Sequence, residues 1–272
     1  MKRASDWTMR TGLLIVVSAI VFVVAAWAHP EDEFCIPGES GLDPALCEAL
    51  AALDSADRRS PLSPEAAALV TDLANRSIGE TVLLYVQIGF QHILPMGLDH
   101  ILFVLGLVLS TPRINQLALQ ISAFTVAHTA TLGLAATGVI TPSSDLVEPL
   151  IAASIAFVAV EAIVLRDPPP WRLALVFGFG LIHGLGFAGA FGELGLPDTQ
   201  FWPGLLGFNV GVEIGQVTVA ATALCALTLA ARILRSSDRD YPIWLIGPAA
   251  LAIAATGLFW TFERIWSTLS LT

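Results

Sequence analysis

Long apolar segments separated by short polar joints dominate the chain after residue 80. A helix of about 20 residues crosses the hydrocarbon layer of a bilayer, and a helix satisfies its own backbone groups where lipid offers no partner. The pattern therefore predicts an all-α membrane domain over residues 81–272, a bundle of six transmembrane helices. The six apolar segments lie at residues 81–110, 117–138, 146–165, 173–194, 204–231 and 243–262.

The first apolar segment is interrupted by Pro95 and Gly97. Because proline is favoured at the first position of a helix, we expect the first true span to begin at Pro95. Residues 81–93 are then expected to form a re-entrant or interfacial helix that precedes this span.

Residues 1–28 have the pattern of a secretory signal peptide. Three basic residues precede the apolar run at residues 12–26, and Ala26-Trp27-Ala28 fits a cleavage site. We expect cleavage after Ala28; an uncleaved anchor is the alternative, because the run is only slightly shorter than a span. Either interpretation exports residues 29–80, an acidic segment that is expected to be periplasmic.

Two of the three cysteines, Cys35 and Cys47, lie in this exported segment. An oxidising compartment permits a disulfide there, and we expect these two residues to form one, with a metal site as the alternative. Cys225 lies alone in an apolar helix, where it is expected to be a small core residue.

Arginine placement predicts the orientation of the spans. Alternate joints carry six arginines, and the joints at residues 138–145 and 195–203 carry no Lys or Arg. Cytoplasmic loops are enriched in basic residues, so the arginine joints are expected inside. The sequence therefore predicts an inner-membrane protein whose mature N-terminus and C-terminus are both periplasmic. The six arginines are Arg113, Arg166, Arg172, Arg232, Arg235 and Arg239.

Composition excludes several classes of function. Only 13% of the residues are charged, about half the share that is typical of soluble domains. The 23 acidic residues outnumber the 13 basic ones, whereas a nucleic-acid-binding protein needs a basic surface. A cytosolic globular enzyme and a nucleic-acid partner are both excluded, and the lipid bilayer is the expected partner.

Ionisable side chains inside spans are costly and usually mark a pathway or a binding site. Because imidazole and carboxylate groups bind divalent transition metals, six such residues are candidate metal ligands: His92, Asp99, His100, His128, His183 and Glu213. Four more are expected to line an ion path or to carry coupling protons: Glu148, Glu161, Asn209 and Gln216. The alternative for each residue taken singly is a satisfied hydrogen-bonding group, or for Asp99 a helix cap.

The expected depths of these groups discriminate between transport and hydrolysis. Under the predicted topology, four groups lie toward the outer side: Asp99, His100, Glu148 and Glu193. The groups expected near the middle are His128, His183 and Glu213, and Glu161 is expected toward the inner end. A staggered arrangement suits a transport path, whereas a hydrolytic site would gather its ligands at one level.

Two glycine stripes predict close helix packing. Gly180 and Gly184 follow small-xxx-small spacing on the fourth span, and Gly207, Gly211 and Gly215 do so on the fifth. We expect the fourth and fifth spans to contact each other, although the spacing also permits other pairings.

The motifs that contain these polar residues resemble signatures of the HupE/UreJ family of membrane proteins. The stretch 89–103, with His92, Asp99 and His100, resembles the first signature. Matching stretches follow in order at residues 124–129, 147–152, 177–188 and 208–216. The resemblance covers roughly residues 85–265 and implies secondary nickel or cobalt permeases that are associated with hydrogenase or urease maturation.

The chain also departs from the hydrogenase-linked members of that family. Six residues separate His92 from Asp99, where those members have five, and Phe187 stands where a second histidine is expected beside His183. These departures indicate the divergent second branch of the family.

The sequence as a whole predicts a permease that imports Ni²⁺ or Co²⁺, without an organic cofactor. Because the chain contains no phosphate-binding G-x-x-x-x-G-K-[ST] loop, transport is expected to be secondary rather than ATP-driven. One alternative is a membrane assembly subunit for metal or haem, with His128 and His183 as axial ligands. The other is an intramembrane zinc hydrolase with His92 or His100, His128 and His183 around one ion. A metalloenzyme-maturation or periplasmic protein is a possible partner.

Overall fold

The computed structural model describes Pro64 and residues 76–111, 113–165, 169–187, 200–233 and 243–271. Every regular element in these ranges is an α-helix. The signal sequence, Cys35, Cys47 and nearly all of the acidic segment lie outside the described residues. The helices are α4 (Ile78–Ile93), α5 (Leu98–Ser110), α6 (Ile114–Ala136), α7 (Ser144–Val164), α8 (Arg172–Gly186), α10 (Phe201–Ile233) and α11 (Ile243–Leu271).

Several of these helices are long and apolar enough to cross a membrane. Four of them, α6, α7, α10 and α11, meet this condition alone. The pair α4 and α5 meets it only together, because the two helices are bent by 71° at the break between them. Helix α8 is apolar but has only 15 described residues. The chain is therefore a helical, multi-pass membrane protein.

Local sequence signals explain where α4 and α5 begin and end. A capping box starts α4, in which the Ser77 backbone N–H donates to the Glu80 carboxylate at 2.8 Å and Glu80 N–H donates to the Ser77 hydroxyl. The helix ends at Ile93, because Pro95 disfavours a helical conformation at the residue before it.

The expectation that Pro95 starts the next helix is wrong. Helix α5 begins at Leu98 with Gly97 as its N-cap, so Pro95 lies inside the break. Gly97 passes so close to the His92 carbonyl that a Cβ atom would collide with it. The chain therefore needs glycine here to complete its sharp bend.

Contacts at both ends of the broken pair place the start of α4 and the end of α5 at opposite ends of the bundle. At the start of α4, Thr81 hydrogen-bonds Gln200, which precedes α10. At the end of α5, Ser110 accepts a hydrogen bond from Arg172 at the start of α8. The starts of α10 and α8 lie at opposite ends of the bundle, because α6 packs parallel to α8 and antiparallel to α10. The break consequently lies deep inside the bundle.

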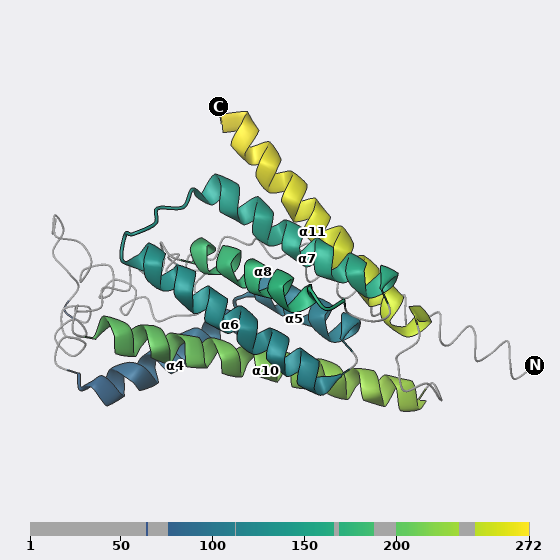
Figure 1. Cartoon of the computed structure of the whole chain (residues 1–272), viewed down its shortest axis with the longest axis horizontal. Coiled ribbons are helices and arrows are strands. Elements are labelled where there is room, and N and C mark those ends of the chain that lie inside the picture. The colour runs from purple at the N-terminus through teal and green to yellow at the C-terminus, as the bar shows by residue number, and fades with distance from the viewer. Residues whose placement is uncertain are drawn as a thin grey trace, which may run out of the picture.

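The helices lie side by side in one bundle, with α4 and α10 along one side and α11 along the other (Figure 1). The main packing pairs are α4 with α10, α7 with α11 and α6 with α8. Buried Phe103, Phe124 and Phe208 belong to the apolar core at its centre.

The glycine stripes mediate two of these pairs, but not the pair expected from the sequence. Gly207, Gly211 and Gly215 face Val82, Val86, Phe90 and Ile93 of α4. Gly180 and Gly184 face Phe124, Ala127 and His128 of α6. The expectation that the fourth and fifth spans pack on each other through these stripes is therefore wrong. Spacing identifies a face that permits close approach, but it carries no information about the partner.

Replacing Gly211 by alanine is expected to destabilise the α4–α10 contact. The new Cβ would lie 2.7 Å from the backbone nitrogen of Phe90 and would collide with the Val86 carbonyl. Overpacking against backbone costs about 1–3 kcal/mol, more than the gain in helix propensity of about 1 kcal/mol. Detergent-titrated unfolding measures the change. Gly178→Ala is the matched control, because nothing lies within 4 Å of its Cβ; equal stability of the two variants would contradict the prediction.

Candidate metal centre

Four histidines from four different helices meet at the centre of the bundle. His92 lies in the last turn of α4, His100 in the first turn of α5, His128 in α6 and His183 in α8. The ring centroid of His100 is 4.8 Å from that of His92, 5.7 Å from that of His128 and 5.0 Å from that of His183. None of the four residues is more than 2% exposed. Four imidazoles thus share one buried site.

Two sets of metal-binding groups overlap in this site. One set contains His92, His100 and His128, and the other contains Asp99, His100 and His183. Within each set, one ligand atom per residue can be chosen so that all lie within 4.8 Å of one another. Two nitrogens bound to one ion at about 2.0–2.1 Å lie about 3.3 Å apart, so small side-chain movements would close either set. His100 belongs to both sets.

Hydrogen bonds leave one ring nitrogen free on His100. Asp99 Oδ1 accepts a bond from the His100 backbone N–H at 2.7 Å and lies 3.0 Å from His100 Nδ1. A carboxylate accepts only, so Nδ1 carries the hydrogen and Nε2 keeps its lone pair. Nε2 is buried, and no described residue hydrogen-bonds it.

The same reasoning applies to His128. The side-chain amide nitrogen of Asn209 donates to the Leu205 carbonyl at 2.8 Å. The side-chain oxygen of Asn209, Oδ1, lies 3.3 Å from His128 Nδ1. That oxygen accepts from Nδ1–H, which leaves Nε2 with its lone pair. Nε2 of His128 is also buried without a hydrogen-bond partner among the described residues.

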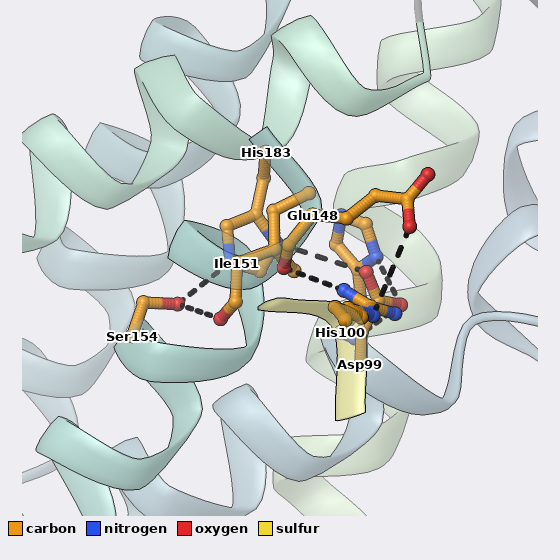
Figure 2. Close-up of polar contacts among 7 residues, drawn as sticks. Asp99, His100, Glu148, Ile151, Ser154 and His183 are labelled. Atoms are coloured by element: carbon orange, nitrogen blue, oxygen red, sulfur yellow. Dashed lines mark hydrogen bonds and ion pairs between the residues drawn. The ribbon is translucent and has the colours of Figure 1, made fainter. Parts of the chain in front are cut away.

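His183 is held by Ser154, a residue that the sequence analysis did not identify. Figure 2 shows the imidazole between Ser154 on one side and Asp99 on the other. The Ser154 hydroxyl donates its one hydrogen to the Ile151 carbonyl at 2.6 Å, so it accepts from His183 Nε2, 2.9 Å away. The lone pair is therefore on Nδ1, which lies 4.0 Å from Asp99 Oδ2.

Three imidazoles thus each use one nitrogen for a protein partner and keep the other available inside the shared site. Metal-binding histidines typically donate their second ring N–H to a carboxylate or another oxygen acceptor in this way. Phenylalanine rings surround the cluster, with Phe187 4.1 Å from His92 and Phe103 5.2 Å from His183 between ring centroids. The arrangement can bind a divalent transition metal through nitrogen in an environment that excludes water.

The expected staggering of the histidines is wrong. Asp99 and His100 were expected toward the outer side, because the first span was assumed to start at Pro95. The break between α4 and α5 instead places them beside His128 and His183 in the middle of the bundle. The histidines therefore form a centre at one level and not a ladder.

The glutamates, unlike Asp99, belong to neither ligand set of this centre. Glu213 of α10 is hydrogen-bonded by Ser122 and Thr125 of α6. Glu148 lies near Arg264, whose Nη1 donates to the Glu148 carbonyl at 2.6 Å and whose Nε is 4.0 Å from its carboxylate. The structure therefore does not bring Glu213 into either ligand set, although the sequence placed it among the candidate ligands. Arg264 was not identified from the sequence; its one available signal is a lone arginine in an apolar helix.

Glu161 forms a separate buried ion pair. Its Oε2 lies 3.0 Å from Nη1 of Arg172, and both side chains are almost fully buried. Arg172 also donates to the Ser110 hydroxyl. The ion pair and this hydrogen bond together connect α5, α7 and α8. In the sequence, Arg172 is recognisable only as an orientation signal, and its pairing with Glu161 gives no pattern there.

Comparison with known proteins identifies one family. The family model described as HupE / UreJ protein matches residues 69–264, which include every helix from α4 to α10 and most of α11. No curated protein matches the chain, and no solved structure does.

Proposed function

Since the chain belongs to the HupE/UreJ family, we propose that it binds a divalent transition-metal ion at the four-histidine centre and carries it across the membrane. One observation supports this most directly: His100, His128 and His183 are each hydrogen-bonded through one nitrogen, and the other nitrogen is buried without a hydrogen-bond partner among the described residues. The three residues belong to two ligand sets that share His100. The ion is the substrate and not a resident cofactor.

The ligand chemistry favours Ni²⁺ or Co²⁺ over Mg²⁺ or Ca²⁺. Imidazole suits later first-row transition metals, whereas hard cations prefer oxygen ligands. The two sets contain five different groups, of which four are imidazoles and one is a carboxylate. Copper and zinc share this preference for nitrogen, so the metal is identified by the uptake test below.

The broken first crossing supports a transport role. In secondary transporters, discontinuous helices place ion-binding groups at mid-membrane. Here His92 ends one half-helix, and Asp99 and His100 start the other. We propose six crossings, α4 with α5 as the first and α8 as the fourth, with the arginine joints inside and both mature ends periplasmic. The two overlapping sets let an ion move from one to the other while it stays bound to His100.

Uptake in cells that lack their own nickel and cobalt importers tests this proposal. We expect uptake of Ni²⁺ or Co²⁺ with the wild type, and its loss with His100→Ala and His183→Ala at equal membrane expression. Cys225→Ala is the control, because Cys225 lies outside the metal centre on α10. The expectation that Cys225 is a core residue is wrong, since its side chain is exposed on the outer surface of that helix. A correctly inserted wild type that takes up neither nickel, cobalt, copper nor zinc would contradict the permease proposal.

One observation favours a second candidate function, an intramembrane metal-dependent hydrolase. The zinc site expected from the sequence required His128 and His183 at one ion, and neither ligand set contains both of them. The set of His92, His100 and His128 nevertheless supplies three histidines for one ion. Three protein ligands with a metal-bound water are typical of catalytic zinc sites. Liposomes with a trapped metal-sensitive dye separate the two functions: a permease delivers the ion to the dye, whereas a hydrolase binds it without delivery.

A further inference from the structure

A second polar cluster lies between α6 and α10, about one helical turn from the metal centre. We call it the Glu213 cluster; it consists of Ser122, Thr125, Glu213 and Gln216. Thr125 precedes His128 by three residues, and Glu213 follows Asn209 by four. Since residues three or four apart lie on one face of a helix, both helices place the cluster beside the His128–Asn209 contact.

The contacts within this cluster are all between oxygen atoms. The Ser122 hydroxyl donates to Glu213 Oε1 at 2.7 Å. The Thr125 hydroxyl lies within hydrogen-bonding distance of Glu213 Oε2, of Gln216 Oε1 at 3.0 Å and of the Ile121 carbonyl at 3.2 Å. A hydroxyl has one hydrogen, so Thr125 can donate to only one of these three acceptors. Two of these three acceptor oxygens therefore receive no hydrogen from Thr125.

The carboxylate of Glu213 also lacks a positive partner. Among the ion pairs of the described helices none involves Glu213. Its side chain is only partly buried, and the neighbouring Ile214 and Val217 are exposed on the apolar outer surface of α10. An uncompensated charge at such a place is costly. Turning the Gln216 amide would supply one hydrogen but no charge.

We propose that the Glu213 cluster binds a sodium ion. One monovalent cation would neutralise the single carboxylate and satisfy the oxygens that have no hydrogen. Oxygen ligands suit hard cations, whereas the nitrogen-rich centre nearby suits transition metals. The binding itself does not depend on the proposed transport; only the role of sodium as coupling ion, suggested by the shared helices, rests on that proposal.

Carbodiimide labelling of purified protein in lipid nanodiscs tests the proposal. Dicyclohexylcarbodiimide reacts with protonated carboxyl groups in apolar surroundings, and mass spectrometry locates the adduct. We expect labelling of Glu213 that sodium suppresses and potassium at equal ionic strength does not. At a sodium concentration ten times the Kd, only about one site in eleven is free of sodium, so labelling of Glu213 should be about elevenfold slower. No transition metal is added.

Three variants and a direct measurement make the result decisive. Ser122→Ala and Gln216→Leu remove sodium ligands, so Glu213 should still be labelled but without sodium protection. Binding of radioactive ²²Na⁺ to the wild type and its loss in Glu213→Gln should agree. If the wild type binds no ²²Na⁺, or labelling of Glu213 responds to pH alone, the site holds only a proton and the proposal is overturned. Because neither measurement contains nickel or cobalt, a failure here leaves the metal-transport proposal untouched, and the converse also holds.

Discussion

Replacing His100 by glutamine is expected to abolish binding of Co²⁺ and Ni²⁺ to the purified protein. His100 is the one residue that belongs to both ligand sets, so its loss damages every position at which an ion can be held. Removal of a residue that only orients a metal ligand lowers the metal affinity about 10–100-fold. The loss of affinity in His100→Gln should be larger than this. Titration calorimetry measures the affinity, and the visible spectrum of bound Co²⁺ reports its coordination.

Two further variants show whether the sets are distinct positions. His92→Gln affects only the set that contains His128, and His183→Gln affects only the set that contains Asp99. Each is expected to leave binding at the other position and to change the Co²⁺ spectrum. If either one abolishes binding as completely as His100→Gln, the centre is a single site. Cys225→Ala is again the control.

Replacing Arg172 by methionine is expected to destabilise the protein by about 3–5 kcal/mol, because it leaves Glu161 as a buried charge without its partner. Arg172 and Glu161 are 3.0 Å apart, and Arg172 also bonds Ser110. The loss therefore affects the contact of three helices. Unfolding in mixed detergent, followed by tryptophan fluorescence, measures the change.

A double variant separates this charge effect from lost packing. Arg172→Met combined with Glu161→Gln removes both charges and should recover most of the stability, since a neutral pair of similar volume carries no unpaired buried charge. Arg232→Met is the matched control, because Arg232 is exposed near the end of α10. If the double variant is as unstable as Arg172→Met alone, the ion pair is not the cause.

The helical class and the approximate spans followed from hydropathy, because lipid forces each crossing segment to be apolar and helical. Helices α6, α7 and α10 lie within a few residues of the predicted segments. The boundary at Pro95 failed for a local reason. Proline ends α4, but the next helix can form only after the chain has turned at Gly97, where the His92 carbonyl leaves no room for a side chain.

Candidate residues could be recognised singly, because histidines and carboxylates are rare in apolar spans. Their grouping could not be derived from the sequence. The residues His92, His100, His128 and His183 are spread over 92 positions, and only the break between α4 and α5 brings the first two beside the others. Ser154 gave no signal, since a lone serine in an apolar helix has the same pattern whether or not it orients a histidine.

The sequence by itself determined that this is a helical membrane protein of the HupE/UreJ type, and which of its polar residues are candidates for a site. Hydrophobicity and residue chemistry are local properties, and a one-dimensional pattern records them directly. The tertiary structure decided that the glycine stripes face α4 and α6, that Glu161 pairs with Arg172, and that Glu213 is separate from the histidines. These are pairings between distant segments, and side-chain packing in three dimensions selects among the many partners that the same pattern permits.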